Sequence, residues 1–229
     1  MDNQKILEMA VDFSGPYVNL AVKKCGDEKV VLTASKLMQR REASAITDFI
    51  QSALKDADLE LLSIGKFTVG SGPGSFTGMR IAAAWVSGFT FGKKDILCRT
   101  VPSAFAIAES CKLGENENAA IIFDGRNREV ILFETARKNG SLIAAGREAI
   151  LNKEQAEKYF TENNFNHFIV VEYDLNAVKL ILPDSVIEKL QVVKEVEAAN
   201  LLNDRLGEFD NDLTRLHYIR PSVATEKLF

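Results

Sequence analysis

Two apolar stretches that each run into an aspartate constrain the fold of this 229-residue chain more than any other feature. KILEMAVDFS (5–14) reaches Asp12, and AAIIFDGR (119–126) reaches Asp124. Each stretch is followed, approximately, by the patterns of two strands, a helix, a strand and a second helix, which predicts two related halves. The repeat is one of pattern, because the residues themselves differ. Apolar strands joined by helices are typical of parallel sheets covered on both faces, so we expect an α/β fold.

Hydrophobic periodicity and turn signals place the individual elements. In the first half they predict strands over 17–24, 29–37, 66–71 and 95–101, and helices over 41–57, 79–91 and 102–113. In the second half they predict strands over 128–137, 141–150 and 167–172, and helices over 152–164 and 195–209. We expect an N-terminal lobe over 1–101 and a C-terminal lobe over 102–229, with the C-terminal segment a candidate to pack back on the first lobe.

Composition excludes several classes of protein. The net charge of −4 gives no overall basic field for RNA or an anionic membrane, and the GRNRE stretch (125–129) is interpreted mainly as solvated surface. Cys25, Cys98 and Cys111 are far apart, which argues against a disulfide scaffold or a zinc ribbon. No signal-peptide layout is visible, and the apolar run 81–92 is too short to span a bilayer. We therefore expect a soluble cytoplasmic protein without a membrane partner.

The glycine-rich stretch TVGSGPGSFTGMR (68–80) raises the question of phosphate binding. A Walker A loop needs lysine after its last glycine, but Met79 and Arg80 follow Gly78 here, and the dinucleotide spacing is also absent. Two interpretations remain open. The stretch is either a structural turn, which we favour, or an anion site at a helix N-terminus to which Arg80 contributes.

The helix predicted over 79–91 carries unusually small side chains on much of its surface. Ala82, Ala83, Ala84, Ser87 and Gly88 allow another backbone to approach closely, and glycine inside a helix is unfavourable by about 1 kcal/mol relative to alanine. This surface either packs on the chain's own sheet or meets a helix of a partner. The helix over 41–57 carries an apolar stripe that could share the same face.

At this point the residues resemble a known family. VGSGPGSFTGMRI (69–81) is very similar to the GxGPGSFTGxR signature of the TsaB family, also called YeaZ, of bacterial tRNA threonylcarbamoyladenosine biosynthesis proteins. AVDFS, FDGRNREV and LHYIR resemble its IDTS, DARRGEVY and YLR patterns. The resemblance covers about the first 140 residues and the extreme C-terminus, and 150–210 carries no signature. The residues matched to the motif loop are Gly70, Gly72, Pro73, Gly74, Ser75, Phe76, Thr77, Gly78 and Arg80.

The resemblance implies a fold of the actin, sugar-kinase and Hsp70 type with two related lobes, each with a βββαβα pattern. It implies a heterodimer with a TsaD-type catalytic paralogue, joined by a TsaE-type ATPase, with tRNA bound through the complex and a homodimer possible when the chain is alone. The family's heterodimer face matches the two helices of the first lobe. The side chains we assign to it are Ile46, Ile50, Met79, Ala83 and Ser87.

Two departures from the family fall on that face. The family often has His-Ser-Glu at the start of its first helix, where Glu42, Ala43 and Ser44 align here. A lysine that is common inside its second helix aligns with Ser87. These changes put the detailed contacts with the partner in question.

The sequence offers little for independent catalysis. The catalytic paralogue binds metal through an HxxxH pair, whereas this chain has His167 and His217 in unrelated segments, so we expect no metal site and no catalytic residue. Asp12, Ser14, Asp124 and Arg126 form a possible vestigial nucleotide cleft, because an aspartate ends the first strand of each lobe in this superfamily. The alternative for both aspartates is a turn-capping role.

The leading hypothesis is therefore a non-catalytic scaffold and activator for tRNA threonylcarbamoylation. It needs no resident cofactor, and ATP and Mg²⁺ would enter only at the level of the complex. The rival is a standalone nucleotide-binding enzyme or kinase that uses Asp12 and Asp124. An older glycoprotease label is disfavoured, because neither HxxxH nor a nucleophile triad is present.

Overall fold

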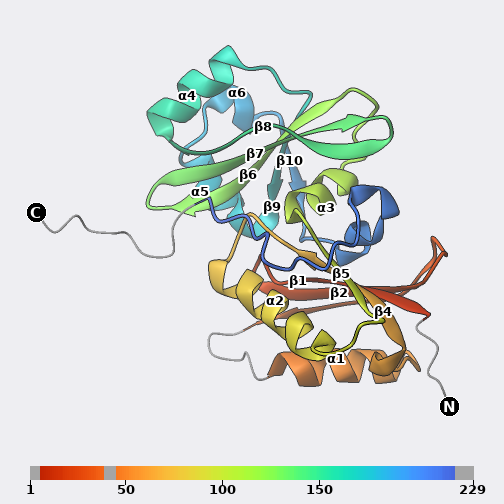
Figure 1. Cartoon of the computed structure of the whole chain (residues 1–229). Helices are drawn as coiled ribbons and strands as arrows, with labels where there is room; N and C mark the ends of the chain where they lie inside the picture. The colour runs from red at the N-terminus through yellow and green to blue at the C-terminus, as the bar shows by residue number, and fades with distance from the viewer. Residues whose placement is uncertain (1–5, 39–44, 220–229) are drawn as a thin grey trace, which may run out of the picture.

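The structure, a computed structural model, describes residues 6–38 and 45–219 (Figure 1). In the first half, β1 (Leu7–Asp12), β2 (Tyr17–Lys24) and β3 (Val30–Leu37) precede α1 (Ala45–Asp56), β4 (Ile64–Gly70), α2 (Phe76–Thr90), β5 (Leu97–Val101) and α3 (Ser103–Ser110). In the second half, β6 (Asn118–Arg126), β7 (Glu129–Lys138) and β8 (Ser141–Asn152) precede α4 (Lys153–Glu162), β9 (His167–Val171), α5 (Leu175–Lys179), α6 (Asp184–Ile187) and β10 (Leu190–Val193). Most predicted elements are present within a few residues of their predicted ends.

The two halves have the same topology. Within the described residues, one sheet has the order β3-β2-β1-β4-β5, and the other, read from its opposite edge, has the order β8-β7-β6-β9-β10. In both sheets the first strand pairs antiparallel with the second and parallel with the fourth. The predicted α/β fold with two related lobes is confirmed. The division at residues 101 and 102 stays a prediction.

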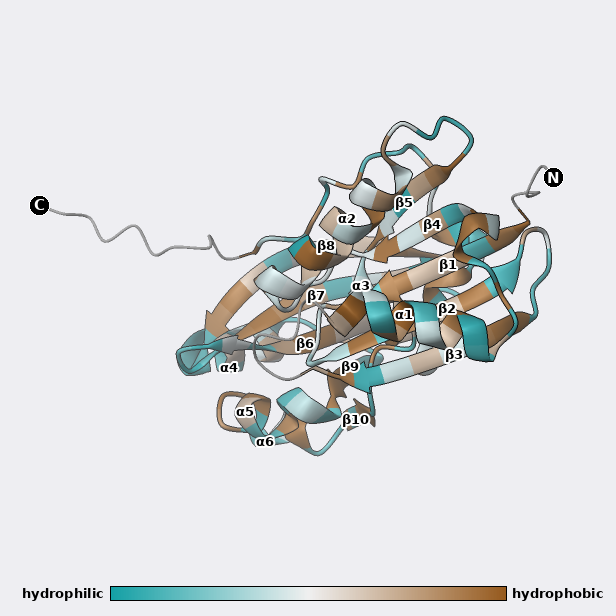
Figure 2. Cartoon of the chain, turned by 90° about the horizontal axis from the view of Figure 1, so that it is seen from below, coloured by the Kyte–Doolittle hydropathy of each residue, from teal (hydrophilic) through white to brown (hydrophobic). Residues whose placement is uncertain are grey.

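Alternating side chains build the layers between and outside the two sheets. Leu7, Met9 and Val11 of β1 point into a core shared with α1 and α2, whereas Ala10 points to the core between the lobes. On β6, Ile121 faces the inter-lobe core and Ile122 faces the core beneath α4, α5 and α6. Figure 2 shows α1 over the first sheet, whose strands carry brown hydrophobic segments beside paler and teal ones, and α1 itself carries both colours. Among the described residues, no helix is long and apolar enough to cross a membrane.

One predicted helix is wrong. Residues 195–209 form two short 3₁₀ turns, Ala198–Leu202 and Asp204–Leu206, instead of an α-helix. The carbonyl oxygens of Leu201 and Asn203 accept hydrogen bonds from the Arg99 guanidinium on β5, at 3.2 and 3.1 Å. These two carbonyls therefore bind a distant side chain, and Gly207 (φ 136°) then ends the segment.

The chain returns to the first lobe after these turns. The backbone N–H of Asn211 donates to the Cys98 carbonyl oxygen (2.8 Å), and the Asn211 side chain accepts from the Cys98 N–H (2.7 Å). Farther along, the His217 N–H donates to the Ser71 carbonyl oxygen at 2.8 Å. Residues 207–219 thus cover the edge of β5 and reach the glycine-rich loop.

Candidate functional site

A cleft of about 690 Å³ lies where the two lobes meet, beside the ends of β1 and β6 that carry the aspartates. The turn after β1, the glycine-rich loop, the end of β6, the residues after β9 and the returning C-terminal segment all contribute to its walls. Asp124 and Arg126 line it from the second lobe, and Ser14 and Ser75 line it from the first. The cleft therefore brings together segments that are far apart in the sequence.

Asp12 does not line this cleft, although it ends β1. Its side chain is fully buried, and its carboxylate accepts hydrogen bonds from the Ser14 N–H (2.9 Å), the Ser14 hydroxyl (2.7 Å) and the Ser103 hydroxyl. Burial raises the pKa of this carboxyl group above its ordinary value, against the lowering effect of those donors. Asp12 thus holds the turn after β1 and the start of α3 together, as the capping alternative expects, and it has no exposed oxygen to offer a ligand.

The glycine-rich loop packs directly on the backbone of that turn. A Cβ at Gly78 would overlap the Phe13 carbonyl oxygen, one at Gly74 would overlap the Ser14 carbonyl oxygen, and one at Gly70 would overlap the Asp12 carboxylate. The N–H of Ser75 donates to the Ser14 carbonyl oxygen at 2.6 Å. The loop also contains a cis peptide bond between Gly72 and Pro73. Contacts within the chain account for these three glycines, as the structural-turn interpretation expects.

Helix α2 begins within the motif, three residues earlier than the sequence pattern predicted. Ser75 caps it, since its hydroxyl accepts the Gly78 N–H at 3.1 Å, and Thr77 in the first turn is exposed. The Arg80 guanidinium lies 3.7 Å from the centre of the Phe76 ring, and its Nε donates to the Tyr218 hydroxyl at 3.2 Å. Arg80 therefore joins the motif to the returning C-terminal segment.

The second aspartate has a different environment. Asp124 accepts the backbone N–H of Arg126 at 2.8 Å and pairs with its guanidinium at 2.7 Å. Burial raises the pKa of the neighbouring Asp174 to about 6; a hydrogen bond from the Asp124 backbone opposes the rise, and the Asp124 carboxylate adds to it. The cleft therefore contains an acidic pair with one arginine, which is a weaker anion site than the sequence pattern suggested.

Tyr173 lines the cleft between the lobes. Its hydroxyl lies so near Gly15 that a Cβ at Gly15 would be only 2.5 Å from it, and its ring centre is 6.4 Å from that of Tyr17. Burial also raises the pKa of this phenol above its usual range. A bulky aromatic side chain of the second lobe thus fills the space beside the turn that follows Asp12.

The structure corrects most of the side chains assigned to the partner face. Ile46, Ile50, Met79 and Ala83 are 3%, 0%, 1% and 8% exposed, because α1 and α2 use these residues to pack within the chain's own core. Ser87 is exposed. The described structure does not include Glu42, Ala43 and Ser44, the other departure from the family pattern.

The exposed side of α2 carries a different set of residues. Small side chains dominate it, and the turn after the helix presents Phe91, which is 88% exposed. Trp85 lies beside this surface and donates from Nε1 to the Thr47 hydroxyl of α1 at 3.2 Å, so the two helices are adjacent. The exposed residues of this stripe are Thr77, Arg80, Ala84, Ser87, Gly88 and Phe91.

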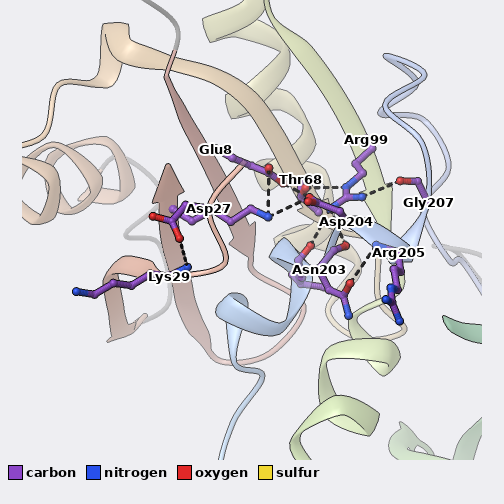
Figure 3. Close-up of polar contacts among 11 residues, drawn as sticks. Glu8, Asp27, Lys29, Thr68, Arg99, Asn203, Asp204, Arg205 and Gly207 are labelled. Carbon is purple, nitrogen blue, oxygen red and sulfur yellow. Dashed lines mark hydrogen bonds and ion pairs between the residues drawn. The ribbon is translucent and has the colours of Figure 1, made fainter. Parts of the chain in front are cut away.

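Sequence reasoning missed a buried ionic network between the first sheet and the 3₁₀ turns (Figure 3). Arg99 is 1% exposed and donates to the Thr68 hydroxyl (2.9 Å) and the Gly207 carbonyl oxygen (2.7 Å), in addition to the two carbonyls of the 3₁₀ region. Its guanidinium also lies 3.5 Å from the carboxylate of Glu8, which lies 3.8 Å from Lys23. The available signal was a charged residue inside each of two apolar strands, 5–14 and 95–101.

Both histidines bind carboxylates of the chain itself. His167 Nε2 lies 2.9 Å from Glu117, and His217 Nδ1 lies 2.8 Å from Glu148. Within residues 6–38 and 45–219, no three or more histidine, cysteine, aspartate or glutamate side chains cluster so that they could hold a metal ion.

Comparison with known proteins identifies the family, which the geometry of the site does not. Residues 34–216 match the model of a family described as TsaD, tRNA N6-adenosine threonylcarbamoyltransferase. A curated relative from Haemophilus influenzae, named tRNA threonylcarbamoyladenosine biosynthesis protein TsaB, is 28% identical over 136 residues. That match covers 59% of this chain and only 56% of the relative, so the chain is aligned to little more than half of the relative's length.

Solved structures show the same fold. YeaZ from Pseudomonas aeruginosa superimposes with a TM-score of 0.68 at 23% identity, covering 86% of this chain and 89% of that one. A second structure, described as an uncharacterized protein with similarity to peptidase YEAZ from the same organism, gives 0.66 at 23% identity, covering 86% and 88%. At this level of identity the likeness establishes the fold alone.

Proposed function

Because this chain belongs to the TsaB/YeaZ group of the threonylcarbamoyltransferase (TsaD) family, we propose that it is a non-catalytic subunit for tRNA threonylcarbamoyladenosine biosynthesis. Its partner is a TsaD-type catalytic paralogue, and the modified base is the adenosine next to the anticodon. A TsaE-type ATPase and tRNA join through the complex. The observation that carries this proposal is the family match over residues 34–216.

The geometry of the cleft supports a non-catalytic role. A catalytic carboxylate must reach its substrate, whereas Asp12 is fully buried and accepts three hydrogen bonds from Ser14 and Ser103. Tyr173 fills the space beside the same turn. Asp12 and Asp124, which would handle a metal and phosphate in a working cleft, instead bind residues of their own half of the chain.

The stripe on α2 is the proposed partner face. Small residues such as Ala84, Ser87 and Gly88 let the backbone of a second helix come close, and Phe91 adds an exposed aromatic ring at the end of the stripe. The buried Ile46 and Ile50 support this face from within by fixing α1 against the sheet. In this proposal the chain activates its partner by holding it in a competent geometry.

The test is complex formation between the two purified proteins. We expect size exclusion with light scattering to show a one-to-one complex with the TsaD-type paralogue from the same genome. Ser87→Arg should abolish it, because a long charged side chain would prevent close approach at the centre of the stripe. Ser185→Arg is the matched control, since Ser185 is an exposed serine on a helix of the second lobe, α6, and should leave the complex intact.

The possible outcomes test the proposed function and the proposed partner face separately. A complex that ignores Ser87→Arg would keep the proposed function and move the interface elsewhere. Absence of a complex at micromolar concentrations, with and without ATP and the ATPase, would contradict the proposed function itself.

The second candidate is a standalone nucleotide-binding enzyme. One observation favours it: Asp124, Arg126 and Asp174 line an open cleft of about 690 Å³. Calorimetric titration with Mg-ATP tests it, and Asp124→Asn is the informative variant because Asp124 lines the cleft. Binding that this variant removes would favour the enzyme, whereas no heat of binding at millimolar nucleotide would exclude it.

A further inference from the structure

The tight turn between β6 and β7 contains an arginine at a position that favours glycine. Arg126 pairs with Glu129, so Asn127 and Arg128 form a two-residue turn, and their φ angles are 50° and 61°. Positive φ at both central residues is the pattern of a type I′ turn, in which asparagine followed by glycine is preferred. Asn127 suits its place, whereas Arg128 adopts a left-handed backbone that is unfavourable for a residue with a Cβ.

The strain continues into the preceding residue. Arg126 has a φ of 62°, so three consecutive residues other than glycine lie in the left-handed region. Backbone strain of this kind persists only where the surrounding structure enforces it, and strained residues cluster at active and binding sites. An arginine in the glycine position therefore directs attention to what the Arg128 side chain can bind.

Arg128 lines a hollow of about 650 Å³ with two other cations. Arg126 and Lys153 line it as well, together with the carboxylates of Asp124 and Glu129. Arg126 already pairs with Asp124 at 2.7 Å, so Arg128 and Lys153, both exposed, provide the cationic character of this rim. The rim has three cations and two carboxylates in a chain whose net charge is −4.

The floor of the hollow is apolar. Ala177, Leu180 and Ile181 line it from the segment that follows β9, and Leu180 is 73% exposed. Arginine and lysine beside an exposed apolar surface suit a nucleotide of single-stranded RNA, whose phosphodiester would meet the cations while its base or ribose contacts the apolar side chains. A free phosphate would use only the cations.

We infer that Arg128 and Lys153 contact phosphodiester groups of the tRNA, with an unpaired base or ribose against Leu180. This inference rests on the proposed function and specifies where this subunit touches the substrate of the complex. Arg128 is a binding residue here, and it takes no part in the chemistry.

The test compares RNA binding with stability in the same variants. Arg128→Gly removes the cation and relieves the left-handed strain, so it should raise the melting temperature of the chain. In complex with the TsaD-type paralogue, it should weaken binding of fluorescein-labelled tRNA by roughly threefold to tenfold and lower the slope of log K against log salt by about 1. Arg128→Lys keeps the charge and the strain, and should retain most of the affinity.

The chain provides a matched control. Lys112 is an exposed cation with a φ of 52°, it follows α3, and it is not part of the hollow. Lys112→Gly should raise stability in the same way and leave both the tRNA affinity and the salt slope unchanged. Lys153→Gln should weaken tRNA binding without a gain in stability.

Three results would overturn the inference: an unchanged tRNA affinity and salt slope for Arg128→Gly, an equal loss for Lys112→Gly, or no tRNA binding by the wild-type complex. Light scattering on each sample separates a failure of the RNA contact from a failure of the proposed function. Absence of the wild-type heterodimer would contradict the proposed function. A heterodimer that forms normally with Arg128→Gly and binds tRNA as before contradicts only the RNA contact.

Discussion

At the scale of single residues, buried charge determines how the lobes are joined. Arg99 spans from the first sheet to the backbone of residues 201–207, and Glu8 compensates its charge at 3.5 Å. Burial raises the pKa of Glu8 and lowers the pKa of Arg99, which is the usual effect of desolvation on each charged form. An ion pair of this kind specifies where the 3₁₀ segment docks, although it adds little net stability over apolar packing.

Replacing Arg99 should therefore be far more harmful than replacing an exposed arginine. Arg99→Met leaves the buried Glu8 with only Lys23 and removes the donor from three carbonyl oxygens, so we expect a loss of about 3–5 kcal/mol in the free energy of unfolding. Arg215→Met is the control, because Arg215 is 67% exposed and its ion pairs should contribute about 1 kcal/mol or less. Urea unfolding measures both, and equal losses would refute the role given to Arg99.

Asp174 should make stability depend on pH. Its pKa is raised from 3.8 to about 6 by burial, so the folded chain binds a proton more readily than the unfolded chain. The contribution of Asp174 to the free energy of unfolding is therefore fully present below pH 3.8 and is lost as the pH rises through 6. Asp174→Asn should be more stable than the wild type at pH 7 by as much as about 3 kcal/mol, with the difference vanishing near pH 4. A difference that does not change with pH, measured by urea unfolding, would contradict this.

At the scale of elements, the entry into α2 depends on how closely the motif loop approaches the turn after β1. The loop has no room for a side chain at Gly78, whose Cβ would overlap the Phe13 carbonyl oxygen. Gly88, ten residues farther along the same helix, has no atom within 4 Å of a Cβ built on it. A close backbone contact therefore requires glycine at position 78 but not at position 88, although both glycines lie in one helix.

Substitution by alanine should change the free energy of unfolding in opposite directions at the two positions. Gly78→Ala should destabilise the chain by about 1–3 kcal/mol, because its Cβ forces the first turn of α2 away from the turn after β1. Gly88→Ala should stabilise it by about 0.5–1 kcal/mol, because alanine favours the helix and meets open space. Thermal unfolding of the two variants tests this, and changes of the same sign would count against it.

How far the elements could be predicted depended on whether their determinants are local. Apolar runs and turn residues located the strands of both lobes except β10, which was not predicted, since the patterns of the other strands lie within each segment. The helix over 195–209 failed because the carbonyls of Leu201 and Asn203 bind Arg99, about 100 residues away. The partner face assigned to Ile46 and Ile50 failed for a related reason: an apolar stripe cannot tell a partner from the chain's own sheet.

At the scale of the whole molecule, duplication produced two lobes that differ in how their aspartates are used. Asp12 is sealed beneath Ser14 and Ser103, whereas Asp124 pairs with Arg126 at the edge of the cleft. The returning segment 207–219 and Tyr173 add further contacts between the lobes. We interpret the molecule as a two-lobed α/β fold in which Asp12 is committed to contacts within the chain and Asp124 remains at the edge of the cleft.

The most direct test of this account is threonylcarbamoyl transfer to tRNA in a reconstituted system. The reaction would contain the TsaD-type paralogue, the ATPase, the threonylcarbamoyl donor and tRNA, with this chain present, absent or carrying Ser87→Arg. We predict modification only when the wild-type chain and the paralogue are both present, and none from the chain without its paralogue. Modification by the chain without the paralogue, or equal modification when the chain is left out, would contradict the account.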